Sequence, residues 1–215
     1  MRINFWLKTW NEGNIGFHQA QIHAALENHW PQLPAGTQVL VPLCGKSRDM
    51  LWLEERGFDV TGVEFVESAV RDFFSESGLA FEKTEQYGHP CYQAEDRNIR
   101  LFCTDFIQLA EDYDGPKFPA LYDRAALVAL PHDMRPPYVA ACRKLLGPAP
   151  KGLLVSMTYE PQSMEGPPFS VEPGEVEHLW GDDLELIGTT DMLASMPRAV
   201  AAGVERLDEY FWEFK

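Results

Sequence analysis

Residues 37–65 constrain the fold of this chain more than any other stretch. They predict a strand, a tight turn at Gly45, a helix over 48–56 and a second strand over 60–63. The first strand is a short, mainly apolar run over 39–43, which is typical of a parallel strand buried on both faces. In an open parallel sheet, ligands bind outside the carboxyl ends of the strands.

Glu64 stands at the carboxyl end of the second predicted strand. It follows Gly45 by nineteen residues, close to the spacing of about 20 between a glycine turn and an acid that binds a ribose. The turn 45–47 lacks the earlier glycine of a phosphate-binding P-loop, because Leu40 stands there. It also lacks the other glycines of a dinucleotide fingerprint. These features favour a ligand with a ribose but no diphosphate, such as S-adenosylmethionine.

Strands alternate with helices along the rest of the chain. Further strands are expected over 99–103, 119–122, 152–159, 184–189 and 206–214. Helices are expected over 15–30, 67–78, 133–146 and 172–180, whereas 81–98 suggests two turns with one short strand between them. This order predicts one domain over 1–215, a doubly wound α/β sandwich with a chiefly parallel sheet. The aromatic-rich segment 1–30 suits either a packed N-terminal helix or a lid over the strand ends.

The charge and the cysteines narrow the class of partner. A formal net charge of −15 over 215 residues argues against nucleic acid as a partner. No signal segment is evident, and no apolar run approaches the roughly 18 residues of a membrane span, so we expect no membrane partner. Four cysteines without metal-ligand spacing indicate no metal site and a reducing, cytoplasmic location.

Polar residues follow two of the later strands. Asp105 and Phe106 come just after 99–103, where they suit either a grip on a planar base or a structural cap. Asp123 and Arg124 end the strand that begins at 119. They either pair with each other as a structural bridge, or Arg124 projects into the ligand crevice.

Several motifs together resemble the thiopurine S-methyltransferase family, in its bacterial form, over nearly the whole chain. The matching stretches are Val39-Leu40-Val41-Pro42-Leu43-Cys44-Gly45-Lys46-Ser47, Gly62-Val63-Glu64, Tyr122-Asp123-Arg124-Ala125-Ala126-Leu127-Val128-Ala129, Gly166-Pro167-Pro168-Phe169 and Trp10 with Gly16-Phe17-His18-Gln19. The resemblance implies a Rossmann-like class I S-adenosylmethionine-dependent methyltransferase fold. Such a fold has a mostly parallel, seven-stranded sheet, helices on both faces and an N-terminal lid segment over 1–30.

The resemblance also implies roles for individual residues. S-adenosyl-L-methionine is the expected cofactor and S-adenosyl-L-homocysteine its product. The residues that match cofactor contacts are Trp10, Leu43, Glu64, Asp105, Phe106 and Arg124. Phe17 matches a substrate contact, and Arg124 and Arg198 match arginines near the acceptor, where a catalytic role is expected. The connector 191–203 departs from the family pattern, with Ala199-Val200-Ala201-Ala202 where charged or aromatic residues are common.

The expected activity is methyl transfer to an aromatic or heterocyclic thiol such as a thiopurine, by a monomer. The two arginines would favour a thiolate by charge and hydrogen bonding. Two alternatives stay open. The acceptor could be a selenium or tellurium species, or the chain could be a non-catalytic cofactor-binding domain.

Overall fold

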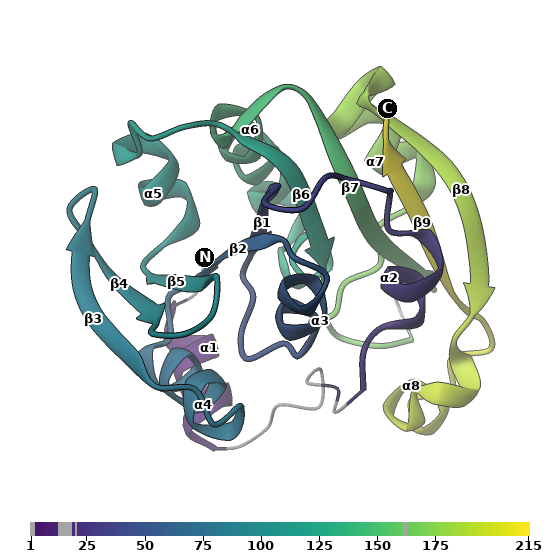
Figure 1. Ribbon diagram of the computed structural model, residues 1–215. Helices are drawn as coiled ribbons and strands as arrows, with labels where there is room; N and C mark the ends of the chain where they lie inside the picture. The colour runs from purple at the N-terminus through teal and green to yellow at the C-terminus, as the bar shows by residue number, and fades with distance from the viewer. Residues whose placement is uncertain (1–2, 13–18, 20, 161–162) are drawn as a thin grey trace.

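A nine-stranded sheet forms the centre of the molecule, in the order β3-β4-β5-β2-β1-β6-β7-β9-β8 (Figure 1). The computed structural model describes residues 3–12, 19, 21–160 and 163–215. The strands are β1 (Gln38–Pro42), β2 (Asp59–Glu64), β3 (Phe81–Gln86), β4 (His89–Ala94), β5 (Ile99–Cys103), β6 (Phe118–Arg124), β7 (Leu146–Tyr159), β8 (Leu184–Asp191) and β9 (Leu207–Phe214). The α-helices are α1 (Ile3–Asn11), α2 (Ala24–His29), α3 (Asp49–Glu55), α4 (Glu67–Glu76), α5 (Phe106–Asp112), α6 (Arg135–Leu145), α7 (Pro173–Trp180) and α8 (Pro197–Ala201).

The central strands run parallel, as the sequence predicts. β1 pairs in parallel with β2 and β6, β2 pairs with β5, and β6 pairs with β7. β9 runs antiparallel between β7 and β8. Helices cover both faces. Side chains of α2, α3 and α4 share one buried apolar cluster with the sheet, and those of α5, α6 and α7 share another. The doubly wound α/β architecture is therefore confirmed.

The expectation of seven strands is corrected to nine, because a hairpin of β3 and β4 extends the sheet beyond β5. Tyr87 and Gly88 join the two strands, and both have positive φ, 54° and 75°. Such a two-residue turn matches the twist of the flanking strands. The inner residues of β3 are exposed, so this edge strand lacks the apolar run by which the other strands were recognised.

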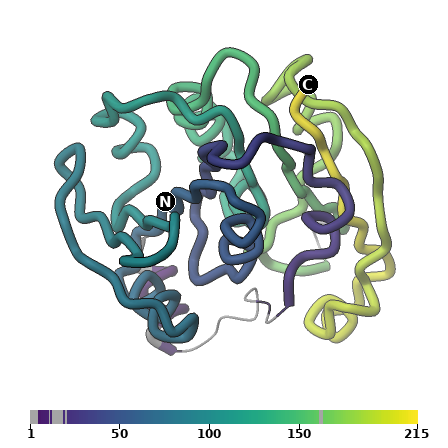
Figure 2. Tube along the Cα trace, in the orientation of Figure 1, coloured from purple at the N-terminus to yellow at the C-terminus, as the bar shows by residue number. Residues whose placement is uncertain are grey.

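The N-terminal segment also differs from its prediction. The helix expected over 15–30 is limited to α2 among the described residues, and residues 21–23 are not helical. His23 ends the irregular stretch, because its Nδ1 accepts the N–H of Ala25 at 3.3 Å and caps α2. Three helices, α1, α5 and α8, were not expected. α1 and α8 lie beyond the carboxyl ends of the parallel strands (Figures 1 and 2). The C-terminus lies on the other side of the sheet, where the parallel strands begin (Figure 2).

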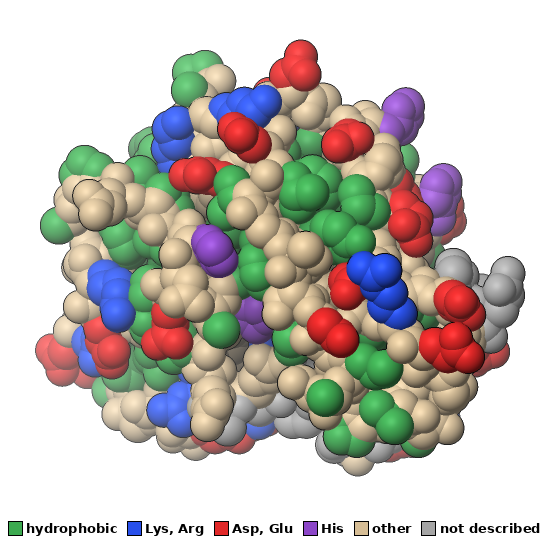
Figure 3. Space-filling view, turned by 90° about the vertical axis from the view of Figure 1, so that its right-hand side faces the viewer, with side chains coloured by type: hydrophobic (Ala, Val, Ile, Leu, Met, Phe, Trp, Pro, Cys, Tyr) green, Lys and Arg blue, Asp and Glu red, His purple; other side chains and the backbone are tan. Residues whose placement is uncertain are grey.

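The surface agrees with the acidic composition. On the face shown in Figure 3, basic side chains are scattered among acidic ones rather than gathered in a broad patch. Among the described residues, no helix combines the length and the apolar character needed to cross a membrane.

Candidate active site

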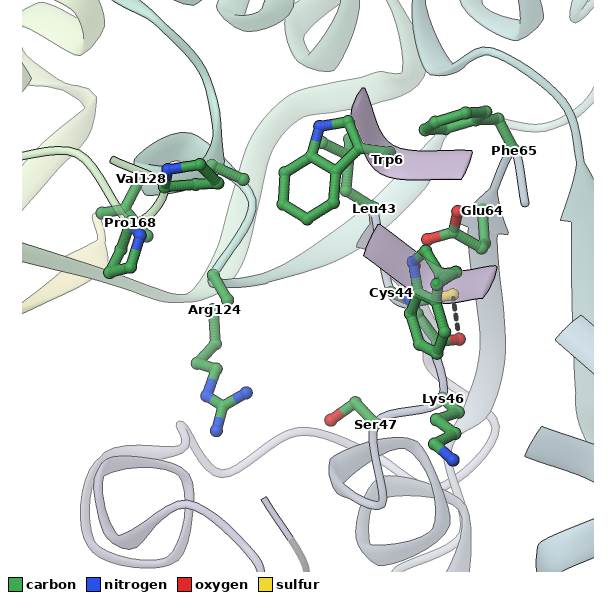
Figure 4. Close-up of a pocket in the computed structure, with 15 residues that line it drawn as sticks. Trp6, Leu43, Cys44, Lys46, Ser47, Glu64, Phe65, Arg124, Val128 and Pro168 are labelled. Atoms are coloured by element: carbon green, nitrogen blue, oxygen red, sulfur yellow. Dashed lines mark hydrogen bonds between the residues drawn. The ribbon is translucent and has the colours of Figure 1, made fainter. Parts of the chain in front are cut away.

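Two joined chambers open beyond the carboxyl ends of the parallel strands. The inner chamber has walls from α1, the Gly45 turn, the end of β2 and the end of β6 (Figure 4). Its lining includes Trp6, Trp10, Leu43, Cys44, Gly45, Lys46, Ser47, Glu64, Phe65, Arg124 and Pro168. The outer chamber adds Val155, Met157, Met192, Met196, Arg198 and Glu209. Both chambers share Trp6, Arg124, Ala125, Val128, Pro167 and Pro168.

The turn after β1 forms the floor of the inner chamber. Leu43 and Gly45 both adopt positive φ, 46° and 52°. That conformation is uncommon for leucine, whereas glycine adopts it readily. A Cβ placed on Gly45 would lie 3.1 Å from the ring of Trp10, so the glycine lets α1 approach the turn closely.

Glu64 fastens this turn to the end of β2. Its Oε2 accepts the N–H of Gly45 at 3.0 Å, and its Oε1 accepts the N–H of Val66 at 2.8 Å. Burial raises the pKa of the Glu64 carboxyl from 4.5 to about 7, although these backbone bonds act in the other direction. Each carboxylate oxygen keeps a further lone pair for a ligand. Glu64 thus lines the chamber at the position expected for a ribose partner.

Arg124 stands where the two chambers meet (Figure 4). Because successive residues of a strand point to opposite faces, its neighbour Asp123 turns away. Asp123 accepts the hydroxyl of Tyr138 at 2.7 Å and the N–H of Leu127 at 3.1 Å. The bridge considered between Asp123 and Arg124 therefore does not form. Burial raises the pKa of Asp123 to about 6.

Asp49, at the start of α3, orients Arg124 from the other side. Its Oδ2 lies 4.0 Å from Nε of Arg124 and accepts the hydroxyl of Tyr122 at 2.9 Å. Its Oδ1 accepts the N–H of His23 at 3.0 Å. Among the described residues none makes a hydrogen bond to the guanidinium, whose side chain is 11% exposed. Arg124 therefore keeps its donors for a ligand, with Asp49 as a nearby counter-charge.

Arg198 reaches the outer chamber from α8. Its Nη1 donates to the carbonyl of Pro167 at 3.2 Å, and its Nη2 donates to the carbonyl of Glu165 at 3.0 Å. These bonds attach α8 to the loop that carries Pro167 and Pro168, both of which line the two chambers. Arg198 thus places a positive charge in the wall of the outer chamber, beside the loop that carries Pro167 and Pro168.

Two of the predicted cofactor contacts, Asp105 and Phe106, lie elsewhere. Asp105 caps α5 by accepting the N–H groups of Ile107 at 2.9 Å and Gln108 at 3.2 Å. Phe106 is buried in the core, with its ring centroid 5.3 Å from that of Tyr138. Neither Asp105 nor Phe106 lines the chambers. Phe17, the expected substrate contact, lies outside the described residues.

Trp6 and Glu209 are two of the lining residues that were not predicted from the sequence. Trp6 belongs to α1, a helix that was not predicted, and it borders both chambers. Glu209 lies on β9 between Leu207 and Phe211, so all three share one face of the strand and all are buried. An acid at an apolar position of an alternating strand is a readable signal, and it marks Glu209 as a functional candidate.

The inner chamber fits the S-adenosylmethionine expected from the sequence. It offers tryptophan and leucine walls, one tight glycine turn and one buried acid, and it has no glycine-rich cradle for a diphosphate. Within the described parts of the chain, no cluster of three or more His, Cys, Asp or Glu side chains is arranged to hold a metal ion.

Comparison with known proteins agrees with this geometry. The model of the family described as Thiopurine S-methyltransferase (TPMT) matches residues 1–215. The thiopurine S-methyltransferase of Pseudomonas fluorescens is 44% identical over 219 residues, covering 100% of this chain and 99% of that protein. The protein of the same name from Nitrosospira multiformis is 41% identical over 213 residues, covering 97% of this chain and 96% of that one.

Two methyltransferases of low sequence identity have solved structures with a similar fold. The 1,6-didemethyltoxoflavin-N1-methyltransferase of Burkholderia thailandensis, solved with S-adenosylhomocysteine, matches with a TM-score of 0.60 at 15% identity, covering 99% of this chain and 86% of that chain. A TehB-like SAM-dependent methyltransferase of Corynebacterium glutamicum matches with a TM-score of 0.54 at 14% identity, covering 99% and 97%. These likenesses concern the fold.

Proposed function

The chain belongs to the thiopurine S-methyltransferase family, and on that premise we propose that it methylates the sulfur of an aromatic or heterocyclic thiol, such as a thiopurine, with S-adenosylmethionine as donor. The observation that carries this proposal is the meeting of the two chambers at Arg124. A donor in the inner chamber and an acceptor in the outer chamber would face each other across this junction.

Trp10, Leu43 and Glu64 would hold the donor. Glu64 would accept hydrogen bonds from the ribose, and the Gly45 turn would let the ligand approach the backbone closely. When bound, S-adenosylmethionine supplies an electrophilic methyl group on a positively charged sulfur. The chain's own task is to align the acceptor with that methyl group and to exclude water.

The outer chamber suits a soft, planar acceptor. Its lining includes Met157, Met192 and Met196, whose thioethers adapt to the shape of an apolar ligand and contact aromatic rings favourably. Arg124 would stabilise the thiolate form of the acceptor by its charge, and Arg198 would hold the proline loop against it. Phe17 is proposed to contact the acceptor as well.

The same proposal includes the oligomeric state and the cellular compartment of the enzyme. The monomeric state is part of the same proposal. All four cysteines are free thiols, which supports a reducing compartment such as the cytoplasm.

A methylation assay tests the proposal. The chain is incubated with labelled S-adenosylmethionine and, in separate reactions, with a thiopurine, with benzenethiol and with a selenium acceptor. Calorimetry with S-adenosylhomocysteine measures the donor site independently. We expect both sulfur acceptors to be methylated. Binding of S-adenosylhomocysteine without methylation of either sulfur compound would contradict the proposal, and methylation of the selenium compound alone would reassign the acceptor.

A further inference from the structure

Glu209 is a buried acid that the donor site does not use. It lies on β9 opposite Met157 of β7, and both side chains line the outer chamber. Its side chain is 8% exposed. A carboxylate in such a place is costly unless hydrogen bonds or an opposite charge compensate the loss of water.

The partners of Glu209 in the described part of the chain are incomplete. Nε2 of His23 lies 3.3 Å from Oε2 of Glu209, within ion-pair distance. Nδ1 of His23 accepts the N–H of Ala25, so Nε2 is the ring nitrogen left for the carboxylate. The contact of Nε2 with Oε2 lacks hydrogen-bond geometry, and Oε2 is enclosed without a hydrogen-bond partner among the described residues. The imidazole orients the carboxylate but leaves its hydrogen-bonding capacity unused.

The described residues around Glu209 do not supply the missing donor. Asp49 has its two oxygens turned to His23 and Tyr122. Burial, and then the charge of Asp49, raises the pKa of Tyr122, and the charge of Glu209 adds to that rise, so both acids lie near the same phenol. The phenol donates to Asp49 rather than to Glu209. Buried polar groups without partners are rare. Because Oε2 is enclosed, Oε1 is the oxygen of Glu209 that can meet a ligand in the outer chamber.

The outer chamber is therefore lined by a positively charged hydrogen-bond donor, Arg124, and by an acidic hydrogen-bond acceptor, Glu209. Arg124 has its guanidinium donors free among the described residues, and Oε1 of Glu209 accepts no hydrogen bond from them, while Oε2 faces His23. A ligand that satisfies both needs an electron-rich atom beside an N–H group. A heterocyclic thione, in which a ring N–H adjoins a C=S group, has that arrangement.

We propose that Glu209 is a specificity-determining and proton-accepting residue that binds the ring N–H of a heterocyclic thione acceptor, with His23 as its positioning residue. The inference deepens the proposed function and rests on it. The inference distinguishes two kinds of acceptor. A thione that carries a ring N–H proton needs Glu209 to accept that proton. An aromatic thiol that has already lost its S–H proton does not need Glu209.

The chemical step balances. The acceptor sulfur forms a bond to the methyl carbon, and the bond between that carbon and the donor sulfur breaks with its electron pair left on the donor. The ring N–H proton moves to the carboxylate of Glu209, the N–H electron pair becomes part of a C=N bond, and C=S becomes C–S–CH₃. The neutral carboxylic acid then returns its proton to solvent.

The test compares E209Q with D208N and with the wild-type chain. Asp208 is the neighbouring buried acid on β9, points to the opposite face and pairs with Arg206 outside the chambers. The matched substitution removes the same charge from the same strand. Each protein, loaded with S-adenosylhomocysteine, is titrated by calorimetry with three probes. They are a thiopurine, its analogue methylated on the ring nitrogen beside the sulfur, and benzenethiol.

We expect E209Q to weaken thiopurine binding by about tenfold or more, the range for a hydrogen bond to a charged group. Binding of the N-methylated analogue and of benzenethiol should change by less than about twofold, and S-adenosylhomocysteine affinity should stay the same. D208N should bind all probes as the wild-type chain does. In steady-state assays, E209Q should methylate benzenethiol normally and the thiopurine slowly.

Three results would overturn the inference: equal losses for all three probes in E209Q, equal losses in E209Q and D208N, or a wild-type chain that binds no thiopurine. A separate result would bear on the proposed function alone. If the wild-type chain binds the thiopurine but methylates no sulfur acceptor, the proposed function fails, and the affinities still decide the role of Glu209.

Discussion

Oε2 of Glu64 accepts the backbone N–H of Gly45 at 3.0 Å, across nineteen residues of sequence. The bond joins the turn after β1 to the end of β2. Because Trp10 packs against the same glycine, α1 meets this junction as well. Three segments therefore depend on one turn, and changes to the turn should affect stability and donor binding together.

Gly45→Ala should destabilise the fold and weaken donor binding. Alanine at the positive φ of 52° costs about 1–2 kcal/mol, and its Cβ would press on Trp10 at 3.1 Å. Gly36→Ala is the matched control, because Gly36 has a φ of 78° with open space around its Cβ. Urea unfolding and S-adenosylhomocysteine calorimetry measure both effects. Equal losses of stability in both variants, with unchanged affinity, would contradict the role of this contact.

Glu64 should make the fold less stable as the pH rises. Its pKa is raised by burial from 4.5 to about 7. Between these values the unfolded chain has released the proton and the folded chain retains it. The free energy of unfolding therefore falls as pH rises through this window, by on the order of 3 kcal/mol for Glu64 alone.

Glu64→Gln removes this titration and should flatten the curve of stability against pH between 4.5 and about 7. The pKa of Asp123 is also raised, to about 6, so Asp123 makes the free energy of unfolding fall with rising pH in both the wild-type chain and the Glu64→Gln variant. The measurement is thus the difference between the two curves, taken from urea unfolding at several pH values. Parallel curves would show that Glu64 does not hold its proton in the folded chain.

Arg124→Ala should lower turnover by about 10²–10³-fold, the typical cost of losing a charged group aimed at the reacting atoms. The fold should stay intact, since the described residues make no hydrogen bond to this guanidinium. Arg71→Ala is the control, because Arg71 pairs with Glu67 on the exposed side of α4, away from both chambers. Methylation kinetics and thermal unfolding are compared. Unaltered kinetics would remove Arg124 from the reaction.

Arg198→Ala should act differently from Arg124→Ala. Its guanidinium is engaged by the carbonyls of Pro167 and Glu165, so its loss should loosen the proline loop against the acceptor. We expect KM for the acceptor to rise several-fold while kcat changes little, as for a group that contributes equally to ground-state and transition-state binding. A fall in kcat at constant KM would instead assign Arg198 to the chemical step.

Local sequence patterns were enough to predict the fold class and the central strands of the sheet. Apolar runs of strand length, the turn at Gly45 and the helix over 48–56 are properties of neighbouring residues, so they can be predicted along the chain. The position of Glu64 at the end of β2 follows from the same run. The strand period of two also implies that Asp123 and Arg124 face opposite sides, which argues against a bridge between them.

The assembly of the site was decided only by the tertiary structure. Trp6, Arg124, Arg198 and Glu209 come from α1, β6, α8 and β9, and no local pattern states that these segments meet. Their meeting depends on the order of strands in the sheet and on where the N-terminal helix and α8 pack, both of which are set by contacts between distant residues. Within 81–98 a short strand between two turns was expected, and β4 fits it, but β3 escaped prediction because an exposed edge strand needs no apolar run. The sequence by itself thus determined the fold class, the glycine turn and its acid. The packing of distant segments decided which charges face the acceptor.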